Sequence, residues 1–255
     1  MFSYFRRHRR QRTASVPLKQ EQWRLIDCRV PQVAGLADAD RLTLGGIVQV
    51  LLDEKTFKGC GGLEMTDEIR LTIAAQAALL LLRQDEPTYY PSLRSILVYP
   101  SAFSSKLTRQ LPNGLVVEGD VARQGESWYR GAIVLSWDDV VRGAADDGDG
   151  HNVTLHEFAH QLDAEDGAVD GAPSLPSRAR YRSWAAVLSE EYESLANELH
   201  RGHATLLDAY GSTSPAEFFA VATELFFERP QAMLRAYPEL YKQLEGFYQQ
   251  DPAAG

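Results

Sequence analysis

The sequence predicts an α+β fold that is mostly helical, with a small mixed sheet lying over one central helix. Several long stretches place apolar residues at helical spacing. Three short runs rich in aliphatic residues, separated by glycine-rich links, indicate strands. The 255 residues are 44 % hydrophobic and 24 % charged, which is the balance of an ordinary globular domain.

The N-terminal segment is basic. Its first twelve residues contain five arginines, and the first acid in the chain is Glu21. We therefore expect residues 1–20 to form a flexible arm and residues 21–255 to form a single domain. Outside those arginines the net charge of −9 becomes −14, which disfavours nucleic-acid binding by the domain. Contact of the arm with nucleic acid or anionic lipid is the alternative.

The remaining elements follow from apolar spacing and from chain breakers. Helices are predicted over 38–57, from Thr66 to about 83, over 178–201 and over 214–227. Thr66 is a typical N-cap with two acids behind it in the first turn, where they face the positive end of the helix. Strands are predicted over 96–99, 115–117 and 132–136, with a short helix starting at Trp137.

The central helix is predicted over residues 152–163 and carries His156-Glu157-Phe158-Ala159-His160. Residues four apart lie on one helix face, so two imidazoles can bind one zinc ion at about 2.0–2.1 Å. Glu157 can then reach a zinc-bound water, whose pKa zinc lowers towards ~7. The apolar surroundings of these polar groups favour a buried site over surface histidines. This predicts a zincin-like metallopeptidase domain with one Zn²⁺ per chain and Glu157 as general base.

A catalytic zinc needs a third protein ligand and keeps one position for water. That ligand must come from another element, because the metal lies off the side of its helix. Ser214-Pro215-Ala216-Glu217 is typical of a helix start, so Glu217 is either a ligand or a capping carboxylate. The residues alone favour Glu217 as ligand and leave other acids and histidines open: Glu165, Asp166, Glu190, Glu191, Glu193, His200, His203 and Glu224.

Two further acids are candidates to support the ligands. Glu224 lies seven residues after Glu217, on the same face of a helix apolar enough to be buried. Asp163 lies three residues after His160. We expect Glu224 to hydrogen-bond a ligand imidazole, and Asp163 to do the same or to cap the end of the central helix.

The sequence also indicates in which cellular compartment the protein is expected. It contains no run of 18 apolar residues, so no membrane span is expected, and its charged start is not followed by the apolar core of a signal peptide. Cys28 and Cys60 are too few for a disulfide framework. We therefore expect a cytoplasmic protein.

Several blocks together are typical of one family: His156–Asp163, Asp208–Tyr210, Ser214–Val221, Phe247–Pro252, Ile96–Pro100, and Gly125–Trp128 leading into Gly131–Leu135. With these blocks the sequence resembles the Mlc titration factor A (MtfA) family. The resemblance covers roughly residues 20–252 and leaves out the basic arm.

The resemblance implies a zinc-dependent peptidase with aminopeptidase activity on a peptide or protein substrate, and a catalytic core similar to that of anthrax lethal factor. It implies that His156, His160 and Glu217 hold zinc and that Glu157 is the base. Tyr210 would steady the oxyanion, although a packed tyrosine ending a loop is the other interpretation. The resemblance also implies a partner, Mlc, a glucose-responsive repressor of sugar-uptake genes.

Two functions are therefore open. The first is a zinc peptidase that acts through an activated water and also regulates sugar uptake by binding a repressor. The second is a regulatory protein that sequesters a transcriptional repressor, with zinc mainly structural. Direct nucleic-acid binding is not expected, apart from the alternative that the arginine arm allows.

Overall fold

The computed structural model describes residues 2–84, 86–101, 105–110, 116–121, 131–146 and 148–254, and only the backbone of 2–4, 105–110 and 116–121. The first part of the chain contains α1 (Phe2–Ala14), α2 (Gln20–Arg29), α3 (Pro31–Ala34), α4 (Asp38–Glu54), β1 (Thr56–Gly59), α5 (Asp67–Leu79), β2 (Ser95–Tyr99), β3 (Ser105–Gln110), β4 (Val116–Val121), β5 (Ala132–Ser136) and α6 (Trp137–Ala145). The second part contains α7 (Val153–Asp163), η2 (Ala164–Asp166), α8 (Arg178–His200), η3 (Ala209–Ser212), α9 (Pro215–Glu228), α10 (Pro230–Ala236), α11 (Pro238–Tyr248) and η4 (Pro252–Ala254).

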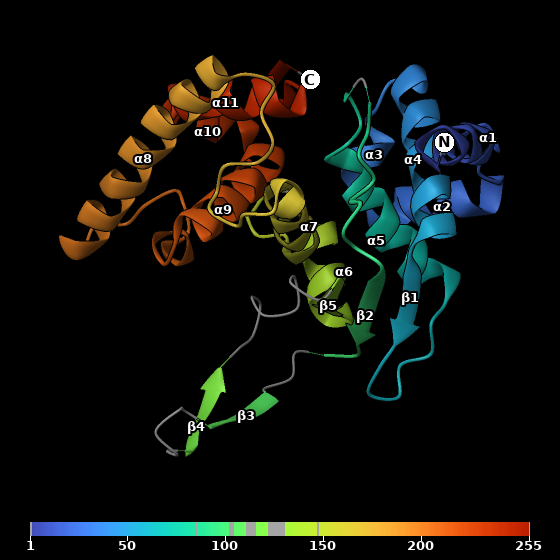
Figure 1. Cartoon of the computed structure of the whole chain (residues 1–255), viewed down its shortest axis with the longest axis horizontal. Coiled ribbons are helices and arrows are strands. Elements are labelled where there is room, and N and C mark those ends of the chain that lie inside the picture. The colour runs from blue at the N-terminus through green and yellow to red at the C-terminus, as the bar shows by residue number, and fades with distance from the viewer. Residues whose placement is uncertain are drawn as a thin grey trace.

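Helices dominate the fold, and α7 lies between two groups of them (Figure 1). Helices α1 to α5 lie on one side and α8 to α11 on the other, with α9 next to α7. No helix in the described part of the chain has both the length and the apolar character that crossing a bilayer requires. The prediction of a mostly helical α+β fold is therefore confirmed.

The sheet differs from the predicted mixed one. Its three strands are all parallel, in the order β1-β2-β5, with Phe57 opposite Ile96 and Ile96 opposite Ile133. Parallel neighbouring strands need a long connection between them. Helix α5 lies in the connection from β1 to β2, and residues 100–131 connect β2 to β5. In β2 and β5 alternate residues are buried, so one face of the sheet lies on the core.

Two sequence predictions about strands are corrected. Helix α4 ends at Glu54 and not at 57, and the four residues that follow Lys55 form β1, the first strand of the sheet. The strand predicted at 115–117 corresponds to β4, which pairs antiparallel with β3 and not with the sheet. Leu115 and the block 125–128 lie outside the described residues.

Buried Lys55 fixes the junction between α4 and β1. Its ammonium group donates to the backbone carbonyls of Tyr90 at 2.7 Å and Leu93 at 2.9 Å. Burial is the main reason that the pKa of Lys55 falls to about 8. Tyr90 in turn meets the Phe158 ring of α7 edge-on, with centroids 4.8 Å apart. This contact places the back of α7 against the N-terminal part of the fold.

The basic segment forms a helix on the body, where the sequence predicts a flexible arm. Arg10 makes two hydrogen bonds of 2.8 Å to the Glu54 carboxylate, and Arg6 adds one of 3.1 Å. The Arg10 guanidinium also lies 4.5 Å from the centre of the Tyr89 ring. Burial would raise the pKa of Glu54, but these arginines lower it to about 2. Arg6 and Arg10 are thus paired with Glu54, far along the chain. The local composition of the basic segment does not reveal this pairing.

We expect Glu54→Gln to lower the free energy of unfolding by about 1–2 kcal/mol, because it weakens charge-assisted bonds from two arginines. The matched control is Asp53→Asn, which removes the more exposed pair with Arg9 and should cost less. Because the folded pKa of Glu54 is lowered, its contribution should be present above the ordinary value of 4.5 and lost as the pH falls through 2. Urea unfolding at several pH values measures both effects, and equal losses for the two variants would contradict the assignment.

Candidate metal centre

Helix α7 begins at a buried asparagine and carries both histidines of the motif. The Asn152 Oδ1 atom accepts from the backbone N–H groups of Thr154 at 3.1 Å and Leu155 at 3.0 Å, which caps the helix. From this start His156 and His160 lie one turn apart, and their buried rings meet edge-on with centroids 4.8 Å apart. The local sequence therefore presents two imidazoles on one face.

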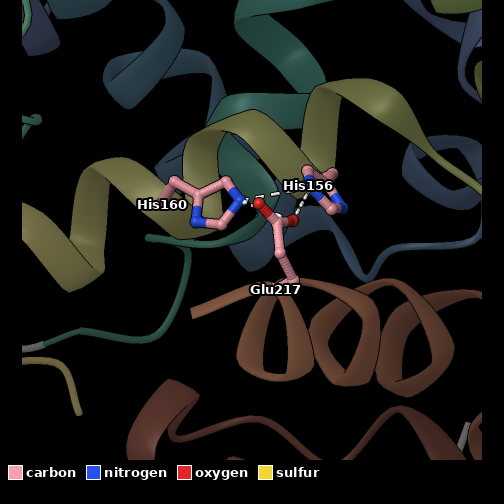
Figure 2. Close-up of side chains that lie close together, drawn as sticks. All are labelled: His156, His160 and Glu217. Atoms are coloured by element: carbon pink, nitrogen blue, oxygen red, sulfur yellow. Dashed lines mark hydrogen bonds and ion pairs between the residues drawn. The ribbon is translucent and has the colours of Figure 1, made fainter. Parts of the chain in front are cut away.

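Helix α9 brings the third group. The Ser214 hydroxyl accepts from Glu217 N–H at 3.2 Å, so the predicted helix start is confirmed. The Glu217 carboxylate, in contrast, does not take the capping position that the sequence left open. It points from α9 towards both imidazoles, with Oε2 at 3.0 Å from His156 Nε2 and 3.3 Å from His160 Nε2 (Figure 2). Glu217 is thus brought to the histidines from a distant part of the chain.

The three donor atoms have the spacing of ligands around one ion. The third distance, between the two Nε2 atoms, is 3.1 Å. A tetrahedral zinc ion with bonds of about 2.0–2.1 Å keeps its ligand atoms about 3.3 Å apart. Two imidazoles and one carboxylate are also a donor set that zinc accepts. The residues present therefore fit a metal ion, and all three are buried.

The burial of these three side chains and their short distances from one another also shift their pKa values. Burial would lower the pKa of His156, but its contacts with Glu217 and Glu224 raise it to about 10. Burial lowers the pKa of His160 to about 4. Burial would raise the pKa of Glu217, but the two histidines lower it to about 2. In the metal-free chain, protonated His156 therefore supplies the positive charge between the carboxylates that a bound metal ion would otherwise supply.

Glu224 lies on the other side of His156. Its Oε1 atom is 2.7 Å from His156 Nδ1, and its Oε2 atom accepts from the backbone N–H of Asn152 at 2.5 Å. The structure therefore brings Glu224 to a histidine of the motif, in the position that the sequence favoured for a supporting group. A carboxylate on Nδ1 holds a proton there, which leaves Nε2 directed at Glu217 and the centre of the group.

Glu157 and Tyr210 are the two predicted catalytic residues that are not ligands. Glu157 is buried on α7 directly after His156, and its charge contributes to the raised pKa values of His156 and Tyr210. Tyr210 lies on η3, 38 % exposed, with its ring 6.0 Å from that of His156. Burial and the charges of Glu217 and Glu157 raise the pKa of Tyr210 to about 12, so its hydroxyl keeps its proton at neutral pH.

A cleft of about 330 Å³ lies beside His156 and Tyr210. It is lined by residues of α6, of α7 and the segment before it, of η3 and the residue before it, and of α9: Asp139, Arg142, Gly143, Asp149, His151, Asn152, Val153, His156, Asp208, Tyr210, Val221 and Glu224. Carboxylates outnumber the basic groups in this lining. Asp139 is paired with Arg142 at 3.1 Å and Glu224 with His156 at 2.7 Å, so the excess of negative charge in the lining comes from Asp149 and Asp208.

Asp163 lies at the C-terminal end of α7 and binds the loop that follows it. Its Oδ2 atom accepts from the backbone N–H of Gly171 at 2.9 Å, in the loop after α7. Gly171 has a φ of 79° and lies so close to Pro215 that a Cβ atom would overlap the Pro215 carbonyl. Asp163 thus joins the end of α7 to the first turn of α9. The sequence could not reveal this, because the partner is a backbone group of an irregular loop.

The other candidates for a third ligand lie elsewhere. His203 pairs with Glu198 at 2.6 Å at the exposed end of α8, and His200 is exposed there too. Glu165 accepts from the Thr88 hydroxyl at 2.6 Å. Sequence reasoning also missed two buried groups that contact each other, Asn152 and Glu228. Their signals were an asparagine just before an apolar helix and a third acid on the face of α9 that carries Glu217 and Glu224.

A buried pair of histidines one turn apart, a carboxylate from a facing helix and a glutamate after the first histidine are the features of a metallopeptidase. The model of the family described as glucose-regulated metallo-peptidase M90 matches residues 5–249. The chain therefore belongs to this family, the Mlc titration factor A family of metallopeptidases. The match includes most of the basic segment, which the resemblance seen in the sequence does not cover.

Relatives that match most of this chain agree with this assignment. An uncharacterized protein of Synechocystis, slr2042, is 42 % identical over 92 % of this chain and 86 % of its own length. Mlc titration factor A of Serratia proteamaculans is 33 % identical over 88 % of this chain and 86 % of its own. The protein of the same name from Klebsiella pneumoniae is 31 % identical over 88 % and 84 % of the two chains.

Zinc binding should release protons, because the metal takes the place of the proton on His156 Nε2. With its pKa raised to about 10, His156 is charged at pH 8 in the zinc-free protein and neutral in the zinc-bound one. Glu224→Gln removes one cause of the raised pKa and should release fewer protons at pH 8 than the wild type. Titration calorimetry in buffers of different ionisation enthalpy counts the protons. Glu165→Gln is the control and should match the wild type, whereas equal release by Glu224→Gln would refute the assignment.

Proposed function

We propose that the protein is a zinc-dependent peptidase that cleaves peptide bonds with the help of Glu157. The observation that carries this proposal is the convergence of His156, His160 and Glu217 at the spacing of zinc ligands. Membership of a metallo-peptidase family supports the same reaction class. Each chain holds one zinc ion on these three residues.

The residues around the three ligands have separate tasks. His156, His160 and Glu217 would hold the zinc ion, which would supply a Lewis acid for the scissile carbonyl and lower the pKa of a water molecule to ~7. Glu157 accepts a proton from the attacking water and returns it to the leaving amine. Glu224 keeps the proton on His156 Nδ1 and so orients that ring.

Tyr210 donates to the oxygen that becomes negative as the carbonyl is attacked. Three observations support this role: its hydroxyl keeps its proton at neutral pH, its ring lies 6.0 Å from that of His156, and it lines the cleft. The Asp208 side chain accepts from Tyr210 N–H at 2.6 Å and holds the start of η3 in place. The partial exposure of Tyr210 leaves it accessible to a substrate.

We further propose that cleavage starts at a free amino terminus, as the family resemblance implies. The negative lining of the cleft supports this, because a protonated amine is favoured beside Asp149 and Asp208. Aminoacyl reporters with free and acetylated amino groups test the preference in the wild type. Equal turnover of both forms would leave a peptidase without the aminopeptidase specificity.

Glu157→Gln should abolish turnover while zinc remains bound, because Glu157 handles protons and is not a ligand. We expect a loss of at least about 100-fold in kcat, with zinc content measured by atomic emission unchanged. Glu165→Gln is a matched control on η2, whose carboxylate contacts Thr88, and should keep full activity. Persisting turnover in Glu157→Gln would remove Glu157 as the base.

Tyr210→Phe should lower kcat by about 10²–10³-fold with little change in KM, because the hydroxyl acts on charge that develops during the reaction. Tyr181→Phe is the control, since it removes a hydroxyl that contacts Leu175 N–H, away from the cleft. A rise in KM with unchanged kcat would instead assign Tyr210 to substrate binding.

The second candidate function is repressor binding, which the relatives' name, Mlc titration factor A, favours. In that proposal the chain sequesters an Mlc-like transcriptional repressor in the cytoplasm, and zinc is mainly structural. A pull-down of such a repressor by Glu157→Gln, together with no cleavage of a peptide library by the wild type, would favour it. Turnover of the library without repressor capture would favour the peptidase alone.

A further inference from the structure

Helix α9 carries a third buried acid that the proposed reaction does not use. Glu228 lies one turn after Glu224 and is 4 % exposed. Its Oε1 atom accepts from Asn152 Nδ2 at 3.0 Å and from Gln32 Nε2 at 3.2 Å. A carboxylate buried beside another carboxylate is unfavourable unless its contacts compensate. Its position next to the N-cap of α7 suggests what those contacts do.

The Asn152 side chain has one orientation that satisfies all its neighbours. Its NH₂ group donates to Glu228 Oε1 and to the Gly143 carbonyl, both at 3.0 Å. Its Oδ1 atom faces the two N–H groups at the start of α7. The Glu228 Oε1 atom and the Gly143 carbonyl accept here, whereas backbone N–H groups only donate. Rotation of the amide by half a turn would therefore place like groups together on both sides.

The backbone of Asn152 is held in position by close contacts, as its side chain is. A Cβ atom at Gly143 would come within 2.9 Å of Asn152 Cα, so α6 lies directly against this residue. Asn152 N–H donates to Glu224 Oε2, whose second oxygen contacts His156 Nδ1. Glu228 and Glu224 thus hold one residue from the same side of α9. A shift of Asn152 would disturb both the cap of α7 and the acid on His156.

We propose that Glu228 is a positioning residue of the metal centre. By setting the orientation of Asn152, it aligns the start of α7 with α9, so that His156 and Glu217 keep the spacing of ligands. The inference rests on the proposed zinc-binding function. Groups one step beyond the ligands typically change metal affinity by about 10–100-fold when they are removed, and Glu228 should act within that range through Asn152.

The test measures zinc affinity by competition with a chelator, using the full-length protein freed of metal. Glu228→Ala should weaken zinc binding about 10-fold or more, and Glu228→Gln, which keeps an acceptor oxygen, should recover most of the affinity. Thr223→Val is the matched control on α9, because it removes a buried hydrogen bond of 2.8 Å to the Tyr248 hydroxyl. It should lower thermal stability with little effect on zinc affinity.

A reciprocal exchange gives a second test that does not rely on the alanine variant folding. Asn152→Asp keeps oxygens for the cap of α7 but sets a carboxylate against Glu228, so zinc affinity should fall. Adding Glu228→Gln supplies a donor to that carboxylate and should restore affinity about 10-fold. Wild-type zinc affinity in Glu228→Ala, or no rescue in the exchange, would overturn the positioning role. If the wild type itself binds no zinc, the proposed function fails instead.

Discussion

The contact of the Glu217 carboxylate with two imidazoles, across the interface of α7 and α9, is the constraint on which the rest of the site depends. Three polar side chains are buried there, within 3.3 Å of one another. Burying such groups is costly unless they satisfy each other or bind an ion. The interface therefore has to hold both helices in one register, because a shift of one residue would move a polar group against apolar neighbours.

The register is held at both ends of α7 by polar contacts with a backbone group. At the C-terminal end, Asp163 binds Gly171, whose missing side chain lets the loop lie on the start of α9. At the N-terminal end, Asn152 is held by Glu224 and Glu228 near the other end of α9. The three candidate metal ligands lie between these two sets of contacts. An apolar contact on the back of α7, Tyr90 on Phe158, prevents rotation away from α9.

The features of this arrangement that can be predicted from the sequence are those within single helices. Spacing of four residues places His156 and His160 on one face, and spacing of seven places Glu217 and Glu224 on another, whatever the fold around them. The features that the sequence does not indicate are long-range pairings. The arginines of α1 meet acids of α4, Asp163 meets a loop amide, and β1 follows α4 with no turn signal between them. Which groups meet across the core depends on packing that no short window contains.

The same contacts give the centre an excess of negative charge. Glu157, Glu217 and Glu224 are buried close to the imidazole of His156, and the second imidazole, His160, has a pKa lowered to about 4. A proton on His156 offsets only part of this charge. A divalent cation offsets more, and it interacts with both helices at once. An ion that binds the folded chain alone stabilises it by about 2.7 kcal/mol when present at 100 times its dissociation constant. Metal binding would therefore be coupled to the alignment of α7 and α9, so that the bound ion and the interface that holds it would stabilise each other.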